Sequence, residues 1–150
     1  MGESARTCGV LTPEFGIDIR LKAVTTNLPL AADKPISFGA HEFCLGCEIC
    51  AQNCPARAIP LGPPTDPPPN ISHNTGFRKW VINAEKSLTF WGINKKKWTI
   101  CGARCIAACP WNKPMNAGHN AVCWIAIHGG DWAKKMLVKG DQFFWGKQGW

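Results

Sequence analysis

The chain has 150 residues and a mass of 16.4 kDa, which is the size of one domain. It carries 17 Lys and Arg against 10 Asp and Glu, and 45 % of its residues are hydrophobic. No run of about 18 apolar residues occurs, so the sequence predicts no transmembrane helix. No basic helix with interleaved aromatic residues occurs either, and we therefore expect no nucleic-acid partner.

The first 37 residues contain little predictable secondary structure. Residues 1–6 lack the apolar region of a signal peptide, and we expect them to belong to the interior of a longer polypeptide. Apolar and polar residues alternate over 17–22, which predicts a half-buried strand. Residues 25–30 are expected to be extended, because the residue before Pro29 avoids the helical region.

The first cysteine run is Cys44-x2-Cys47-x2-Cys50-x3-Cys54-Pro55. This is the bacterial spacing that holds a cubane iron–sulfur cluster, with the fourth cysteine ligating the other cluster of a pair. One or two helical turns are expected over 48–52, ending before the proline.

A second, imperfect run follows as Cys101-x3-Cys105-x3-Cys109-Pro110. Interleaved ligation then assigns the cysteines to two clusters. The first cluster would be held by Cys44, Cys47, Cys50 and Cys109, and the second by Cys54, Cys101 and Cys105. Because cysteines spaced this closely are poorly placed to form disulfides with one another, we prefer a metal cluster to a disulfide framework. Zinc is the closer alternative, since paired Cys-x2-Cys motifs also bind zinc.

The second cluster lacks one ligand in this assignment. The missing ligand could be Cys123, Cys8 or His119. Without any fourth ligand the second cluster would be a [3Fe–4S] rather than a [4Fe–4S] cluster.

The remaining segments give weaker predictions. Six prolines in residues 60–69 predict a stiff exposed loop, and residues 77–91 favour neither a helix nor a strand pair. Short helices are predicted over 105–109, 120–127 and 132–138, with Gly129-Gly130 separating the last two. The apolar tail 143–145 is expected to pack against another part of the protein.

Several motifs together resemble the C-terminal portion of corrinoid-dependent reductive dehalogenases. They are Leu11-Thr-Pro-Glu-Phe-Gly16, Thr26-Asn-Leu-Pro-Leu30, Asp33-Lys-Pro35, Phe43-Cys44, Cys50-Ala-Gln-Asn-Cys-Pro55 and Cys105-Ile-Ala-Ala-Cys-Pro-Trp-Asn-Lys-Pro114. The resemblance covers roughly residues 8–115.

The resemblance implies an α+β fold with a bacterial two-[4Fe–4S] ferredoxin-type module over residues 38–114. Residues 1–37 and 115–150 would be pieces of a nitroreductase-like corrinoid-binding domain that flanks the module. The chain would then be a C-terminal fragment of the enzyme.

The resemblance also implies a function. Two clusters would pass electrons from an upstream donor to a cobalamin, which removes halogen from an organohalide. Such enzymes are exported by the twin-arginine route and held at the outer face of the cytoplasmic membrane by a small anchor protein. The family's proton donor is a tyrosine, and this chain has none. Arg20 is the candidate for the basic catalytic residue near that tyrosine, and Trp98 is the candidate for an aromatic residue lining the substrate pocket on the corrinoid side.

Two alternatives remain open. Epoxyqueuosine reductases share the corrinoid, both cysteine runs and a Cys-Pro-Trp-Asn-Lys ending, but act on a tRNA base. A freestanding two-cluster ferredoxin would carry electrons without a catalytic site. The upstream reading frame would discriminate between a dehalogenase and a carrier.

Overall fold

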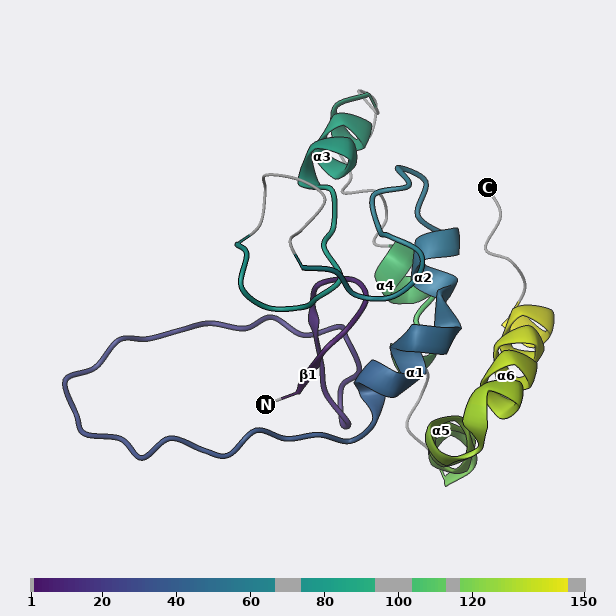
Figure 1. The fold of residues 1–150 in the computed structure, drawn as a ribbon, viewed down its shortest axis with the longest axis horizontal. Helices are drawn as coiled ribbons and strands as arrows, with labels where there is room; N and C mark the ends of the chain where they lie inside the picture. The colour runs from purple at the N-terminus through teal and green to yellow at the C-terminus, as the bar shows by residue number, and fades with distance from the viewer. Residues whose placement is uncertain (1, 67–73, 94–103, 113–116, 146–150) are drawn as a thin grey trace.

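The computed structural model describes residues 2–66, 74–93, 104–112 and 117–145. Its centre is formed by two short helices that follow one another, α1 (Ala40–Cys47) and α2 (Ile49–Gln52). Helix α4 (Arg104–Ala107) packs beside α2, while α5 (Ala117–His128) and α6 (Gly130–Trp145) pack against α1 (Figure 1). A small antiparallel sheet completes the mixed α and β architecture.

The sheet is a hairpin of β1 (Glu3–Ser4) and β2 (Val10–Leu11), in which Glu3 pairs with Leu11. Leu11 is completely buried. A second tight turn follows, in which the backbones of Thr12 and Gly16 exchange two hydrogen bonds. Strand β1 also packs against α1, so the hairpin lies on the central helices.

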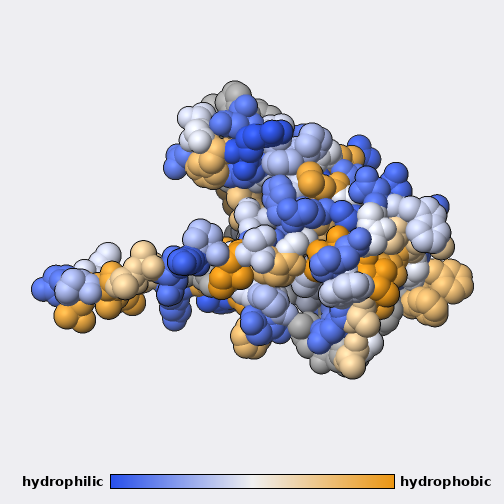
Figure 2. All heavy atoms as spheres, turned by 60° about the horizontal axis from the view of Figure 1, so that its bottom comes forward, coloured by the Kyte–Doolittle hydropathy of each residue, from blue (hydrophilic) through white to orange (hydrophobic). Residues whose placement is uncertain are grey.

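The strand predicted over residues 17–22 does not form. Ile17 is buried, but residues 18–37, all of which the structure describes, run as an exposed arm without helix or strand. The arm extends to the left in Figure 1. Apolar side chains stand among polar ones along it (Figure 2). The alternating pattern indicates a half-buried strand only where a neighbouring strand and a core face are available, and residues 18–37 meet neither in this chain.

The helices agree with most of the sequence predictions. Helix α2 occupies the predicted turns of residues 48–52, and α4 the start of 105–109. Residues 77–91, for which the sequence favoured neither a helix nor a strand pair, contain most of helix α3 (Ala84–Ile93). Helices α5 and α6 confirm the two predicted C-terminal helices and extend beyond both. Helix α1 was not predicted, and a short 3-10 helix, η1 (Pro110–Asn112), follows the second run.

The core lies between the hairpin, α1 and the end of the second cysteine run. Its largest members are Trp80 and Trp111, and the Trp111 ring meets the rings of Phe38 and Phe43 edge-on. The aromatic residues Phe143 and Phe144, near the end of α6, are instead exposed and pack against each other. Across the described residues, no helix is both long and apolar enough to span a membrane.

Candidate metal centre

Three cysteines of the first run are positioned by a sharp turn between α1 and α2. Cys44 and Cys47 lie on α1, and Cys50 lies on α2. Between them, Glu48 has a φ of 52°, in the left-handed region. Glu48 both ends α1 and begins α2, so the chain changes direction between Cys47 and Cys50. A side chain other than glycine is uncommon in this conformation and carries a conformational cost, which the surrounding contacts must offset.

Cys109 comes to the same place from the second run, because α4 packs beside α2. Burial raises the pKa of Cys47 well above its ordinary value, and the thiols of Cys44, Cys109 and Cys50 raise it further. Burial likewise raises the pKa of Cys109 to about 12, with Cys44 and Cys50 adding to the shift. The structure therefore brings together the four cysteines that the sequence assigned to the first cluster.

Backbone N–H groups oppose the effect of burial on two of these sulfurs. The N–H of Ile49 lowers the pKa of Cys47, and the N–H of Trp111 lowers the pKa of Cys109. Hydrogen-bond donors near sulfur favour its anionic form and stabilise the reduced state of an iron–sulfur cluster.

The donor set fits an iron–sulfur cluster. Burial raises the pKa of Cys50 to about 12, so these thiols stay protonated near neutral pH unless a cationic centre replaces the proton. Among the described residues, no three His, Cys, Asp or Glu side chains meet closely enough for a single metal ion. The irons of a cubane occupy separate corners, so the ligands of a cubane stand further apart than those of one ion.

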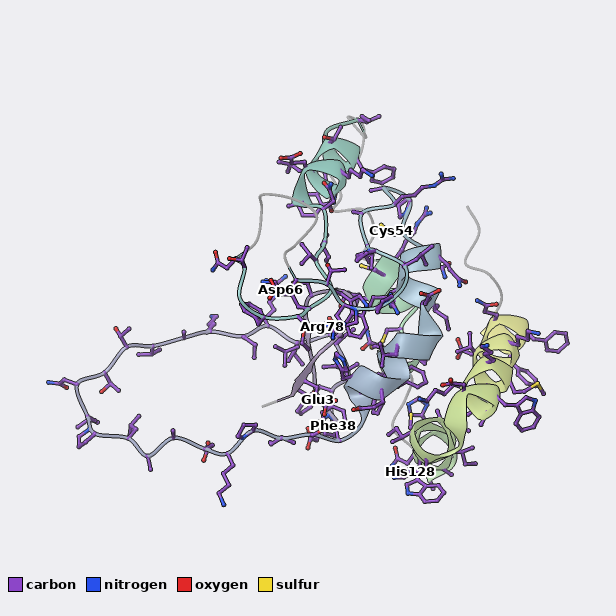
Figure 3. All side chains as sticks on the ribbon, viewed as in Figure 1. Glu3, Phe38, Cys54, Asp66, Arg78 and His128 are labelled. Atoms are coloured by element: carbon purple, nitrogen blue, oxygen red, sulfur yellow. The ribbon has the colours of Figure 1, made fainter. Side chains whose placement is uncertain are left out.

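The second predicted ligand set is only partly described. The sulfur of Cys54 accepts a hydrogen bond of 3.3 Å from the backbone N–H of Ala58 (Cys54 is labelled in Figure 3). Cys105 lies on α4, close enough to Cys50 for its charge to raise the pKa of Cys50. Cys101 lies outside the described residues.

The three candidates for the missing ligand lie in two different places. Cys123 and His119 are one turn apart on α5, with 3.3 Å between Sγ and Nε2. Both line a cavity of about 520 Å³ between α5, α6 and Phe43. Cys8 is exposed in the turn of the hairpin. The assignment of a fourth ligand stays a prediction.

The two candidate residues for the catalytic pocket lie away from these thiols or outside the described residues. Arg20 is exposed on the arm, and Trp98 is not among the described residues. Their roles remain predictions.

Two charged residues of the hairpin, Glu3 and Arg6, hold the helix that carries Cys44 and Cys47, and neither was identified from the sequence. At the start of α1, the carboxylate of Glu3 accepts the backbone N–H groups of Phe38 at 2.8 Å and His41 at 2.9 Å (Figure 3). Gly39, the N-cap residue, has no side chain to do this. Burial by itself would raise the pKa of Glu3, but these bonds and one from the Ser37 side chain hold it below its ordinary value.

At the other end of α1, the guanidinium of Arg6 binds the carbonyl of Cys44 through Nη2 at 2.7 Å and Nε at 3.2 Å. Glu3 and Arg6 therefore place a negative charge at the N-terminus of α1 and a positive charge at its C-terminus, which complements the helix dipole. No local sequence pattern predicts these contacts, because they join residues 35 to 38 positions apart in the chain.

Comparison with known proteins agrees with the geometry of the thiols. Residues 43–112 match the family described as "4Fe-4S double cluster binding domain". The chain is 39 % identical over 125 residues to a tetrachloroethene reductive dehalogenase of Sulfurospirillum multivorans, covering 83 % of this chain and 24 % of that protein. The chain is homologous to a segment of the reductive dehalogenases.

The reductive dehalogenase likeness extends to the fold. A solved structure described as suggesting a mechanism for B12-dependent dehalogenation superposes with a TM-score of 0.74 at 29 % identity. The match covers 97 % of this chain and 20 % of that one. The chain thus spans about a quarter or less of the length of these relatives.

Epoxyqueuosine reductases, the alternative considered from the sequence, are related as well. The enzyme of Bacillus cereus is 30 % identical over 119 residues, covering 77 % of this chain and 28 % of that protein. Its identity is lower than that of the Sulfurospirillum dehalogenase, which favours the reductive dehalogenases.

Proposed function

We propose that this chain is the electron-transfer part of a corrinoid reductive dehalogenase. Its two iron–sulfur clusters would pass electrons, one at a time, to a cobalamin held by the remainder of the enzyme. When bound, the reduced corrinoid supplies the nucleophilic or electron-donating chemistry that removes halogen from an organohalide. The observation that carries the proposal is the convergence of four thiols from two runs, two of them buried and two half-buried, within a chain homologous to dehalogenases.

The residues of this chain would bind and insulate the clusters. Cys44, Cys47, Cys50 and Cys109 hold the first cluster, and the burial of Cys44 and Cys47 limits the access of water to it. Cys54, Cys105 and Cys101 hold the second. Helix α4 carries Cys105 of the second cluster, and the loop before η1 carries Cys109 of the first. The two clusters would therefore lie close together, as short-range electron transfer requires.

The flanking segments extend this proposal. Residues 1–37 and 115–150 would be pieces of a nitroreductase-like corrinoid-binding domain, with the module in 38–114 between them. Exposed apolar residues on the arm, such as Val24 and Leu30, and on α6, such as Phe143, are consistent with a covered surface. Arg20 would then be the basic residue near the proton-donating tyrosine of the remainder of the enzyme, and Trp98 would line the substrate pocket on the corrinoid side.

The wider setting belongs to the proposal as well. An upstream donor would reduce the clusters, and a small anchor protein would hold the enzyme at the outer face of the cytoplasmic membrane. The tetrachloroethene named for the Sulfurospirillum relative is one substrate to test. Halide release from it by the complete enzyme, with cobalamin and a low-potential reductant, would support dehalogenation. Turnover of epoxyqueuosine-containing tRNA with no halide release would favour the reductase alternative.

The cluster proposal can be tested on the 150-residue chain. Anaerobic reconstitution with iron and sulfide should give about seven to eight irons per chain, from one [4Fe–4S] cluster and a second of three or four irons. The protein should also show a broad visible absorption. Stoichiometric zinc without iron after purification and reconstitution would contradict it.

Substitution of a first-cluster ligand tests the interleaved arrangement. Cys50→Ser should remove about half of the iron and also weaken the second cluster, because shared ligation couples the two sites to one fold. Cys8→Ser and Cys123→Ser serve as matched thiol controls and test the missing ligand at the same time. Whichever of them changes a [4Fe–4S] into a [3Fe–4S] spectrum supplies that ligand. A second cluster that survives intact in Cys50→Ser would contradict the interleaving.

A further inference from the structure

Arg6 is a charged residue in the interior of the protein, with 1 % of its surface exposed. A guanidinium remains protonated in proteins, so this is a permanent positive charge. Burying a charge is costly unless it is paired and hydrogen-bonded. A buried arginine therefore requires partners that offset this cost.

All five N–H groups of Arg6 can be accounted for by backbone carbonyls. Two bonds reach the carbonyl of Cys44 and one reaches that of Leu45 at 3.3 Å. Nη1 binds the carbonyls of Pro60 at 2.9 Å and Gly62 at 2.7 Å. The Cys44 and Leu45 carbonyls belong to the last turn of α1, where carbonyls have no partner within the helix. Arg6 thus joins the cysteine-bearing helix to the loop that follows the first run.

Neighbouring side chains fix the guanidinium in place. It lies over the Trp80 ring, with Cζ 4.8 Å from the ring centroid, and the Trp80 indole N–H bonds to the Gly62 carbonyl at 2.9 Å. Glu48 accepts the backbone N–H of Gly62 at 2.7 Å and lies 3.6 Å from Arg6 Nη2. The Glu48 side chain is 28 % exposed against 1 % for Arg6. Water therefore screens the carboxylate more than the guanidinium, and the pair leaves net positive potential on the interior side.

The positive charge acts on the sulfur positions of the first cluster. The guanidinium bonds to the carbonyl of Cys44, a proposed ligand of that cluster, with Nη2 at 2.7 Å and Nε at 3.2 Å. Because Arg6 is 1 % exposed, little solvent screens its charge from an electron added to the cluster. A buried cation beside the cluster therefore favours the reduced state.

We propose that Arg6 is a positioning residue for the first cluster: it fixes the end of α1 and raises the reduction potential of the cluster held by Cys44, Cys47 and Cys50. This inference rests on the proposed ligand set. It adds that the N-terminal hairpin, which lies outside the matched domain of residues 43–112, is part of the electronic environment of the cluster.

The test is a potentiometric titration of the anaerobically reconstituted chain, followed by electron paramagnetic resonance. The signal that disappears in Cys50→Ser identifies the first cluster. In Arg6→Gln, the ratio of reduced to oxidised first cluster at a fixed potential should fall about tenfold, which is about 59 mV for one electron. Arg6→Lys keeps the charge and should stay closer to the original ratio. Glu48→Gln keeps the shape but removes the opposing charge, and should shift the ratio upward.

Exposed Arg78 provides the matched control, because Arg78→Gln changes the net charge equally. It should leave the ratio within about twofold, since solvent screens an exposed charge. Arg6→Gln behaving like Arg78→Gln would overturn the proposal, as would shifts of the same sign in Arg6→Gln and Glu48→Gln. If Arg6→Gln does not hold the first cluster, an unshifted Glu48→Gln overturns the potential-setting role and an upward shift supports it. Absence of clusters in the unsubstituted chain would instead contradict the proposed ligand set.

Discussion

Two neighbouring segments that precede the matched domain behave in opposite ways. Residues 2–17 fold onto the cluster module, whereas residues 18–37 form an exposed arm. The arm has the more regular apolar pattern, yet Val24 is 89 % exposed and Leu11 of the hairpin 0 %. Apolar periodicity alone therefore does not decide which flank packs. The hairpin packs because Glu3 and Arg6 satisfy both ends of α1.

The difference has a physical origin in the needs of a short helix. Helix α1 has only eight residues, so most of its backbone N–H and carbonyl groups lie in terminal turns without internal partners. Side chains that supply those partners gain hydrogen bonds to groups that are otherwise costly to bury. The arm offers apolar side chains such as Val24, but none of the hydrogen bonds that Glu3 and Arg6 make to the ends of α1.

The largest effect that sharpens this comparison is expected from Leu11→Ala. Leu11 lies in the core beside the central helices, and emptying such a site costs about 2–5 kcal/mol. Leu28→Ala on the arm is the matched control and should change stability by about 0.5 kcal/mol or less, since Leu28 is exposed. Urea denaturation of the reconstituted chain, followed by tryptophan fluorescence, measures both. Equal losses would show that the arm is packed in solution.

A somewhat smaller loss is expected for Gly16→Ala, at the end of the hairpin segment. Gly16 has a φ of +60°, and a Cβ there would collide with Asn112 Oδ1 and the Trp111 carbonyl. Backbone strain of this kind costs about 1–3 kcal/mol before the collision is counted. Asn112 Oδ1 also accepts the Ile17 N–H at 2.8 Å, so the collision disturbs the junction with the second run.

Gly76→Ala separates the two contributions in Gly16→Ala. Gly76 also has a positive φ, of +99°, but a Cβ there meets nothing within 4 Å. It should show the strain without the collision, and so the smaller loss in the same urea titration. If Gly76→Ala lost as much stability as Gly16→Ala, backbone strain alone would account for both, and the collision with Asn112 would contribute nothing measurable.

Glu3→Gln should cost about 0.5–2 kcal/mol near neutral pH, the range for loss of a helix N-terminal cap. The pKa of Glu3 is lower in the folded chain than its value of 4.5 when unperturbed. The carboxylate therefore adds stability that is fully present above pH 4.5 and is lost as pH falls through the folded pKa. The stability difference between the two proteins should shrink below about pH 4.5.

The control for this pH dependence is Glu14→Gln, which removes an exposed carboxylate. Urea midpoints measured between pH 3 and 7 (a range spanning the usual carboxyl pKa of about 4.3) give the comparison. A difference between Glu3→Gln and the original chain that stays constant down to the lowest pH would argue against the cap.

The smallest effect is expected on the arm itself. Val24→Ser should change the stability of the 150-residue chain by about 0.5 kcal/mol or less, as is usual for exposed positions. The same urea titration measures it. A loss above about 1 kcal/mol would place Val24 in a packed environment and make the arm resemble the hairpin.

The sequence by itself predicted the candidate ligands and several of the helices, but not α1, which carries Cys44 and Cys47. The spacing of Cys44, Cys47, Cys50 and Cys54, with the following proline, is a local property that stereochemistry ties to cluster binding. The helices around Cys105, over 120–127 and over 132–138 were likewise predicted, because helix formation depends on nearby residues.

Only the tertiary structure decided how these parts are held together. Glu3 caps a helix that begins 35 or more positions further along the chain, and Asn112 contacts Ile17 from 95 positions away. The burial of Arg6 and the left-handed backbone of Glu48 likewise depend on contacts with other segments. Contacts over such separations leave no periodic pattern, so a single arginine in a polar N-terminal segment looks like a surface residue. The failed strand over 17–22 has the converse reason: its pattern was local, but the partner strand it required was not there.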